Sequence, residues 1–187
     1  KLKELVEELG IPAKTVVDPT LLLSKEQWNE LLPKFRYRRE KYILYYELLP
    51  SPKALVFAQK KAEAIGCKLL IMDASIHTLP QKGHIEDASP IDFLHAIRDA
   101  EFVIATSFHG TAFSIIFEKQ FLTLGLNKNA DRVLTLLGHL DILEHYQNEP
   151  KTVANINYKQ LSESYNQLIL QSKQALLSAI DKQRTLV

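Results

Sequence analysis

Five short, mostly apolar segments are spaced along the chain. Short, uninterrupted apolar runs are typical of strands that are buried on both faces, as they are in parallel sheets. The runs predict strands at 15–17, 42–46, 69–72, 102–106 and 121–125. We therefore expect a single parallel sheet to form the centre of the fold.

Segments whose apolar residues recur with helical spacing lie between these runs. Ser24 with Gln27 three residues later fits a capping box, and Pro52 and Gly66 fit the start and the end of a helix. The predicted helices cover 1–9, 25–32, 53–65, 91–99, 110–118, 131–137 and 158–183. Strands that alternate with helices in this way predict a Rossmann-like α/β domain, a parallel sheet with helices on both faces.

Three stretches follow neither pattern. Residues 73–89 form a long loop, a type of segment that is often functional, and residues 141–145 form a turn. A linker at 150–157 precedes the last helix, whose apolar stripe contains one polar member, Ser172. We expect an α/β domain over 1–150, followed over 151–187 by a linker and a long helix that packs on this domain or on another one.

Composition narrows the class of protein. The 187 residues are 46% hydrophobic and 24% charged, as in an ordinary globular domain. A net charge of +1 provides no general attraction for nucleic acid or for an anionic membrane. The single cysteine, Cys67, excludes an internal disulfide, and no apolar run approaches the roughly 20 residues that cross a bilayer. We therefore predict no nucleic-acid partner and no transmembrane segment.

The first residue is Lys1, and the only methionine is Met72. We expect this chain to be the carboxyl half of a longer protein, with an amino-terminal domain missing.

Residues 101–128 contain the clearest candidate for a functional site. An apolar strand is followed by the polar turn Thr106-Ser107-Phe108-His109-Gly110, then by a buried helix and a further strand. In parallel sheets, ligands bind beyond the carboxyl ends of the strands, where the N–H groups at helix N-termini attract anions. His109 is predicted at that place, and Gly110 would let a ligand approach the backbone.

Several segments together resemble the polysaccharide pyruvyl transferase family. They are DPTLLL near the start, YILYY followed by a helix, a later LLGHLDI and, most specifically, SPIDFLHAIRDAEFVIATSFHGTAFSIIF. The resemblance covers roughly residues 1–145. It implies a fold similar to the carboxyl-terminal domain of the GT-B glycosyltransferases, in which two Rossmann-like domains face each other across a cleft.

The resemblance also implies an activity. Members of the family transfer a pyruvyl group from phosphoenolpyruvate to a pair of sugar hydroxyls as a ketal, in the biosynthesis of cell-surface polysaccharides. The implied partners are phosphoenolpyruvate as donor and a saccharide or lipid-linked oligosaccharide as acceptor, with no cofactor. The implied location is cytoplasmic, with peripheral contact to the membrane as an option. Because such a site is assembled from two domains, we expect this chain to be inactive alone.

Residue roles follow from the same resemblance. His109 matches the catalytic histidine, which gives and accepts protons near neutral pH. Lys128 lies where the family has a donor-binding lysine. Some members carry an arginine two residues before the histidine, and here that position is Ser107. The missing charge would come from Arg132 or from the absent half.

Each of these residues also has a structural interpretation. His109 is either catalytic or a cap of the helix 110–118. Ser107 and Thr111 are either helix caps or ligand contacts, and Lys128 is either an anion binder or a solvated lysine. For Asp18-Pro19-Thr20 we favour a structural turn over a catalytic carboxylate.

Other candidates are weaker. His77 and His84 lie in one loop, but no third ligand has suitable spacing, so we predict solvent-exposed histidines and no metal site. Tyr42, Tyr45 and Tyr46 are interpreted as core residues and not as a sugar platform.

Two other function classes remain open. A GT-B nucleotide-sugar glycosyltransferase would need a carboxylate for the ribose, for which Glu118 and Glu144 are the candidates. A non-catalytic binding domain of the same fold is the second alternative.

Overall fold

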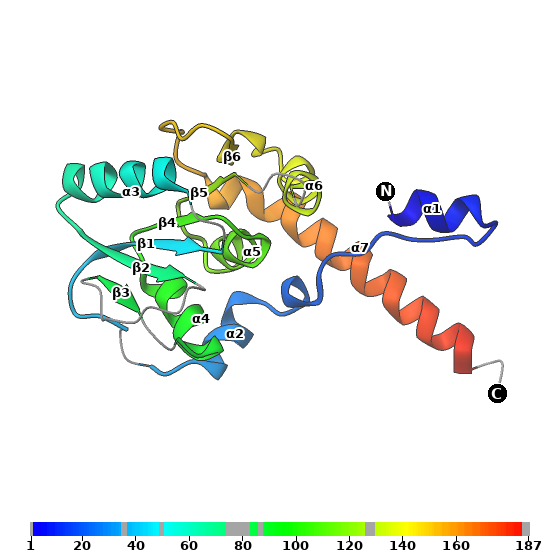
Figure 1. Cartoon of the computed structure of the whole chain (residues 1–187). Coiled ribbons are helices and arrows are strands. Elements are labelled where there is room, and N and C mark those ends of the chain that lie inside the picture. The colour runs from blue at the N-terminus through cyan, green and yellow to red at the C-terminus, as the bar shows by residue number, and fades with distance from the viewer. Residues whose placement is uncertain are drawn as a thin grey trace.

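The computed structural model describes residues 2–34, 37–48, 51–73, 83–85, 88–125 and 130–184. The elements follow one another in chain order (Figure 1). They are α1 (Leu2–Glu8), η1 (Pro19–Leu22), α2 (Lys25–Leu31), β1 (Tyr42–Glu47), α3 (Pro52–Ala64), β2 (Lys68–Asp73), β3 (His84–Ile85), α4 (Pro90–Asp99), β4 (Phe102–Ala105), α5 (Phe108–Ile116), β5 (Phe121–Leu124), α6 (Asp131–His139), η3 (Leu143–His145), β6 (Tyr146–Gln147) and α7 (Tyr158–Arg184).

Six strands form one sheet in the order β3-β2-β1-β4-β5-β6, and every neighbouring pair is parallel. This is the strand order of a doubly wound Rossmann-like fold. The predicted α/β class and the parallel sheet are therefore confirmed. The strand order reverses between β1 and β4, so the ends of these two strands form the topological switch point, where ligands bind in folds of this kind.

Helices cover both faces of the sheet, as predicted (Figure 1). On one face, three alanines of α3 pack against the side chains of Ile43, Tyr45 and Ile104. On the other face, residues of α4, α5 and α6 pack against Leu44, Val103 and other inward-facing residues of the strands. Tyr42 and Tyr45 are almost fully buried, which confirms their assignment to the core.

The predicted strand at 15–17 is wrong. Residues 11–18 lie outside the sheet, and the N–H of Val17 donates to the hydroxyl of Ser172 on α7, 3.1 Å away. Val16 and Val17 therefore indicated a strand where none of the described strands lies alongside, because the pairing partner of a strand is not encoded locally.

Two strands were not predicted. β3 lies inside the segment 73–89 that was assigned to a loop, and β6 follows the turn predicted at 141–145. Each strand is two residues long, too short to show any apolar run or alternation. Only their pairing with β2 and β5 identifies them, and the sheet therefore has six strands where five were predicted.

The long helix α7 is joined to the domain at its start and in its first half. The Tyr158 hydroxyl donates to the carbonyl of Lys119, and buried Leu161 belongs to the main core. Ser172, the polar member of the apolar stripe, is 4% exposed, and its hydroxyl donates to the Leu168 carbonyl while it accepts from Val17. Beyond this point α7 extends past the sheet (Figure 1). Leu177 and Ile180, in this part of the helix, are exposed. Within the described ranges, no helix has both the length and the apolar character needed to span a membrane.

Candidate functional site

The helix that carries the candidate histidine begins with a side-chain cap. The Ser107 hydroxyl accepts a hydrogen bond from the N–H of Gly110 at 2.8 Å, which is the geometry of an N-cap. The helix therefore begins at Phe108, two residues before the predicted start at 110. This places His109 on the first turn of α5. Because Ser107 is the cap, the alternative in which His109 caps this helix is wrong.

His109 is exposed and lies just beyond the carboxyl end of β4. β4 pairs in parallel with β1, with Ala105 opposite Tyr46, so the first turn of α5 stands at the topological switch point. The imidazole packs edge-on against the Phe108 ring, with 5.4 Å between the ring centroids. In the part of the chain that the structure describes, no hydrogen bond engages the imidazole nitrogens. The ring is therefore accessible at the place where a substrate would bind.

The side chains of Ser107 and Thr111 face the interior. Ser107 is 3% exposed and Thr111 is fully buried. The Thr111 hydroxyl donates to the Ser107 carbonyl at 2.9 Å and lies 2.6 Å from the Thr123 hydroxyl on β5. Both residues thus hold the start of α5 against the sheet. Their predicted contact with a ligand stays a prediction.

Two of the backbone N–H groups at the start of α5 already have an acceptor within the protein. The N–H groups of Gly110 and Thr111 are already used, since they donate to the hydroxyl and the carbonyl of Ser107. Among the described residues, no acceptor is bonded to the N–H groups of Phe108 and His109. The N–H groups of Phe108 and His109, and not those of Gly110 and Thr111, are therefore the hydrogen-bond donors that an anion could use at this helix end.

Arg132 approaches the same helix end from α6. Its guanidinium carbon lies 3.8 Å from the centroid of the Phe108 ring, a cation–π contact, and its Nη2 forms an ion pair with Oδ2 of Asp18. The Arg132 side chain remains 56% exposed. A positive charge therefore stands beside the first turn of α5. That it replaces the missing family arginine stays a prediction.

Asp18, predicted from the sequence only as part of a turn, lies in one cluster with His109 and Arg132. The turn is confirmed, since Asp18 caps η1 by accepting from the Thr20 N–H at 3.1 Å and from the Thr20 hydroxyl at 2.8 Å. Burial by itself raises the pKa of the Asp18 carboxyl, but these hydrogen bonds and the positive charges of Arg132 and His109 outweigh it. The pKa therefore lies below its ordinary value, and the carboxylate is charged at neutral pH. The only sequence signal was the position of Asp18 in the DPTLLL segment.

The remaining candidate residues, one lysine and two histidines, have different outcomes. Lys128 and His77 lie outside the described residues. His84 is not solvent-exposed as predicted: its side chain is 15% exposed, and its Nδ1 lies 3.0 Å from Oδ2 of Asp73 at the end of β2. The error arose because the strand β3, which carries His84 into the sheet, was not foreseen. Within the described ranges, no group of three His, Cys, Asp or Glu side chains is arranged to hold a metal ion.

The carboxylates considered for a nucleotide ribose lie at the wrong edge of the sheet. Glu118 follows the last turn of α5 and forms an ion pair with Lys25. Glu144 lies in η3, the short helix that directly precedes β6. Both positions are at the amino ends of parallel strands, whereas His109 is at the carboxyl ends. Neither carboxylate can therefore complete a nucleotide site around His109.

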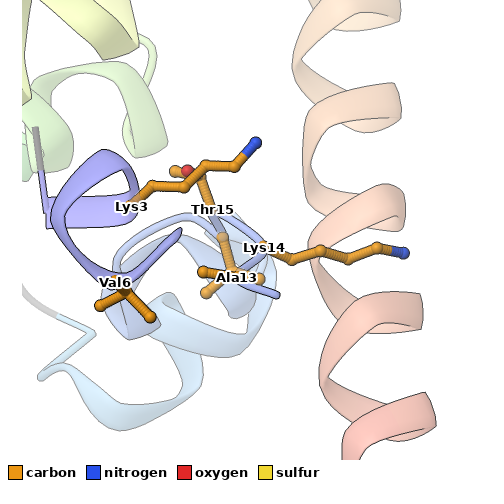
Figure 2. A pocket seen from close by; sticks show the side chains of 6 residues that line it. Lys3, Val6, Ala13, Lys14 and Thr15 are labelled. Atoms are coloured by element: carbon orange, nitrogen blue, oxygen red, sulfur yellow. The ribbon is translucent and has the colours of Figure 1, made fainter. Parts of the chain in front are cut away.

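A hollow of about 300 Å³ lies elsewhere, between α1 and the extended segment that follows it (Figure 2). It is lined by Lys3, Val6, Ala13, Lys14, Thr15 and Val16. It shares no residue with the cluster of Asp18, His109 and Arg132. The candidate functional site is therefore the exposed first turn of α5 and not this hollow.

Comparison with known proteins gives one family match. The family model described as polysaccharide pyruvyl transferase matches residues 2–128, which include Asp18, Ser107, His109 and Lys128. No curated protein matches the chain. A solved structure described as "Crystal Structure Analysis of the Glycotransferase of kitacinnamycin" is 11% identical, with a TM-score of 0.34, and the match covers 89% of this chain and 52% of that one. The chain thus spans about half the length of that structure, and a likeness at this TM-score supports no argument about function. Similarity to the carboxyl-terminal GT-B domain stays a prediction.

Proposed function

This chain belongs to the polysaccharide pyruvyl transferase family, and we propose that it carries part of the site that transfers a pyruvyl group from phosphoenolpyruvate to two sugar hydroxyls. The single observation that supports this proposal is the placement of an exposed histidine, His109, on the first turn of α5 beside the guanidinium of Arg132. A proton-transfer group and a cation are the two features that an anionic enol ester requires.

The donor carries a phosphate and a carboxylate. In the proposal, the free N–H groups of Phe108 and His109 and the charge of Arg132 bind one of these anions at the start of α5. Lys128, in the segment after β5, is proposed as a further donor-binding group because it matches the lysine of the family. Ser107, Gly110 and Thr111 are proposed to shape the helix start on which these donors stand.

The chemistry then needs two proton transfers. Protonated His109 gives its proton to the methylene carbon of phosphoenolpyruvate, which becomes a methyl group, while a first sugar hydroxyl forms a bond to the neighbouring carbon. That hydroxyl loses its proton to the neutral imidazole. The second hydroxyl then replaces the phosphate at the same carbon, and its proton leaves on the phosphate. One donor and one diol thus give one ketal and one hydrogen phosphate, with no oxidant, reductant or cofactor.

The acceptor and the setting belong to the proposal as well. A saccharide or lipid-linked oligosaccharide would approach the exposed His109, since α5 is otherwise packed against the sheet, α4, η1 and α6. A second domain of the intact protein would supply the remaining contacts. Phosphoenolpyruvate is a cytoplasmic metabolite in this proposal, so the reaction takes place on the cytoplasmic side, free in solution or at the membrane surface.

Ligand-induced thermal shift tests the proposed donor. A ligand that binds only the folded state raises the melting temperature of the intact protein. Phosphoenolpyruvate should raise it, whereas a nucleoside diphosphate should not, and the Arg132→Gln variant should lose most of the shift. A shift with the nucleoside diphosphate alone would contradict the proposal and favour a glycosyltransferase. The absence of a shift with either ligand would favour a non-catalytic domain.

A further inference from the structure

Asp18 places a negative charge at a site that is proposed to bind a doubly anionic donor. Its side chain is only 15% exposed and is ionised, as the lowered pKa indicates. A carboxylate that faced the donor directly would weaken binding by charge repulsion. Its presence therefore requires an account beyond the capping of η1.

The two oxygens of this carboxylate have different partners. Oδ1 accepts both hydrogen bonds from Thr20, from the N–H at 3.1 Å and from the hydroxyl at 2.8 Å. Oδ2 accepts from Nη2 of Arg132, a residue 114 positions away in the sequence. One oxygen thus completes the local turn, and the other holds a side chain of a different element.

Arg132 is therefore held at two points. The Asp18 carboxylate fixes one terminal nitrogen, and the Phe108 ring supports the face of the guanidinium at 3.8 Å. A guanidinium has five N–H donors in a fixed plane, so an arginine that is held in this way can still present others to a ligand. The Phe108 ring also contacts His109, so the same side chain connects the held arginine with the candidate catalytic histidine.

We propose that Asp18 is a positioning residue, which acts through Arg132 by holding the guanidinium beside the first turn of α5 in the orientation that binds the anionic donor. This inference rests on the proposed function, because it specifies how one of its donor-binding groups is oriented. Holding the side chain in advance removes part of the entropic cost of ordering a long, exposed arginine when the donor binds.

The matched variants separate this role from capping. Asp18→Asn keeps an oxygen that caps η1, since asparagine is as good an N-cap as aspartate, but it removes the charge that holds Arg132. Thr20→Val removes the hydroxyl that donates to Oδ1 and leaves the Arg132 ion pair in place. In the intact protein, Asp18→Asn should raise the KM for phosphoenolpyruvate about tenfold with kcat within about twofold, and Thr20→Val should leave KM within about twofold.

A double-mutant cycle tests whether Asp18 influences donor binding through Arg132. Because Asp18 acts through Arg132, the Asp18→Asn/Arg132→Gln double variant should have a KM within about twofold of that of Arg132→Gln alone. The proposal would be overturned if Asp18→Asn raised the KM by the same factor in the presence and absence of Arg132→Gln. It would also be overturned if Asp18→Asn and Thr20→Val changed the KM equally. Asp18→Glu, which restores the charge on a longer side chain, should recover part of the lost donor affinity.

A spectroscopic measurement gives an answer that does not depend on the donor. Nitrogen-15 NMR of the Arg132 guanidinium should show hindered rotation in the original protein and in Thr20→Val, and averaged signals in Asp18→Asn. If the original protein neither binds nor turns over phosphoenolpyruvate, the proposed function is wrong, while this measurement still decides whether Asp18 holds Arg132. Averaged signals in the original protein would overturn the positioning role itself.

Discussion

Gly110 on α5 lies so close to Ala105 at the end of β4 that a Cβ added to Gly110 would come within 2.7 Å of the Ala105 Cβ. The same added atom would meet the Ser107 hydroxyl and the Tyr46 ring at 3.0 Å. The missing side chain thus lets the first turn of α5 rest directly on β4 and β1. This contact determines how His109, one residue earlier, stands at the edge of the sheet.

We expect Gly110→Ala to destabilise the domain by about 1–3 kcal/mol. The added methyl group has no space, and the nearest atom, the Ala105 Cβ, cannot move away without the backbone of β4. Equilibrium urea denaturation measures the change. Gly138→Ala is the matched control: Gly138 is also helical, and the nearest atom to its added Cβ, a methyl of Leu143, is 3.9 Å away. This control should be neutral or stabilising by up to about 1 kcal/mol. Equal effects of the two substitutions would show that the packing of Gly110 is looser than described.

For the proposed activity, His109→Asn in the intact protein should lower kcat by roughly 10²–10⁴, the contribution of a general acid or base. The free energy of unfolding should change little, because the imidazole is exposed. His139→Asn, at an exposed histidine in the last turn of α6, should leave turnover within about twofold. A His109→Asn variant that unfolds would argue for a structural role of this histidine, and one that keeps full turnover would contradict its catalytic role.

Ser172→Ala should destabilise the protein by about 1–2 kcal/mol, because the N–H of Val17 would lose its acceptor in a partly buried place. The melting temperature and urea denaturation report this loss. Ser162→Ala on the same helix is the control, since the Ser162 hydroxyl donates only to the carbonyl of Lys159 and is exposed. Its effect should remain within about 0.5 kcal/mol. If Ser172→Ala is equally mild, the contact between residues 15–17 and α7 is not formed in solution.

A prediction about pH concerns Asp99 at the end of α4. Burial raises the pKa of its carboxyl, but Arg98, the N–H of Tyr37 and His95 lower it by a larger amount, so the pKa in the folded protein lies below the unfolded value of about 3.9. A lowered pKa contributes stability that is fully present above the unfolded pKa and is lost as the pH falls through the folded pKa. The stability advantage of the original protein over Asp99→Asn should therefore be largest above about pH 5 and shrink below about pH 4. This difference in stability is measured by chemical denaturation of both proteins between pH 3 and pH 7, at pH values where unfolding is reversible. An advantage that grows on acidification would contradict the assignment.

Much of the fold was accessible from local patterns. The strands β1, β2 and β4 were predicted because each contains a continuous apolar run, and β5 because three of its four residues are apolar. The starts of the helices α2, α3 and α4 were predicted to within one residue, and in the structure the hydroxyls of Ser24, Ser51 and Ser89 cap them. Capping and burial of a run depend on residues close in the chain, so the amino-acid order alone indicates them.

The two short strands and residues 15–17 show where local patterns fail. β3 and β6 are strands only because β2 and β5 pair with them, and Val16 and Val17 are not in a strand because none of the described strands pairs with them. The pairing of a strand is a contact between distant segments. The free energy of that pairing depends on which strand the rest of the fold places alongside, and no short window of sequence contains that information.

The candidate site divides in the same way. By itself the sequence determined that His109 follows a buried strand and stands near the start of a helix, because both features are local. Only the tertiary structure decided that Asp18, 114 positions before Arg132, holds its guanidinium against Phe108, and that Glu118 and Glu144 lie at the opposite edge of the sheet. Charges act through space, and the parallel crossovers of the sheet determine which side chains share an edge.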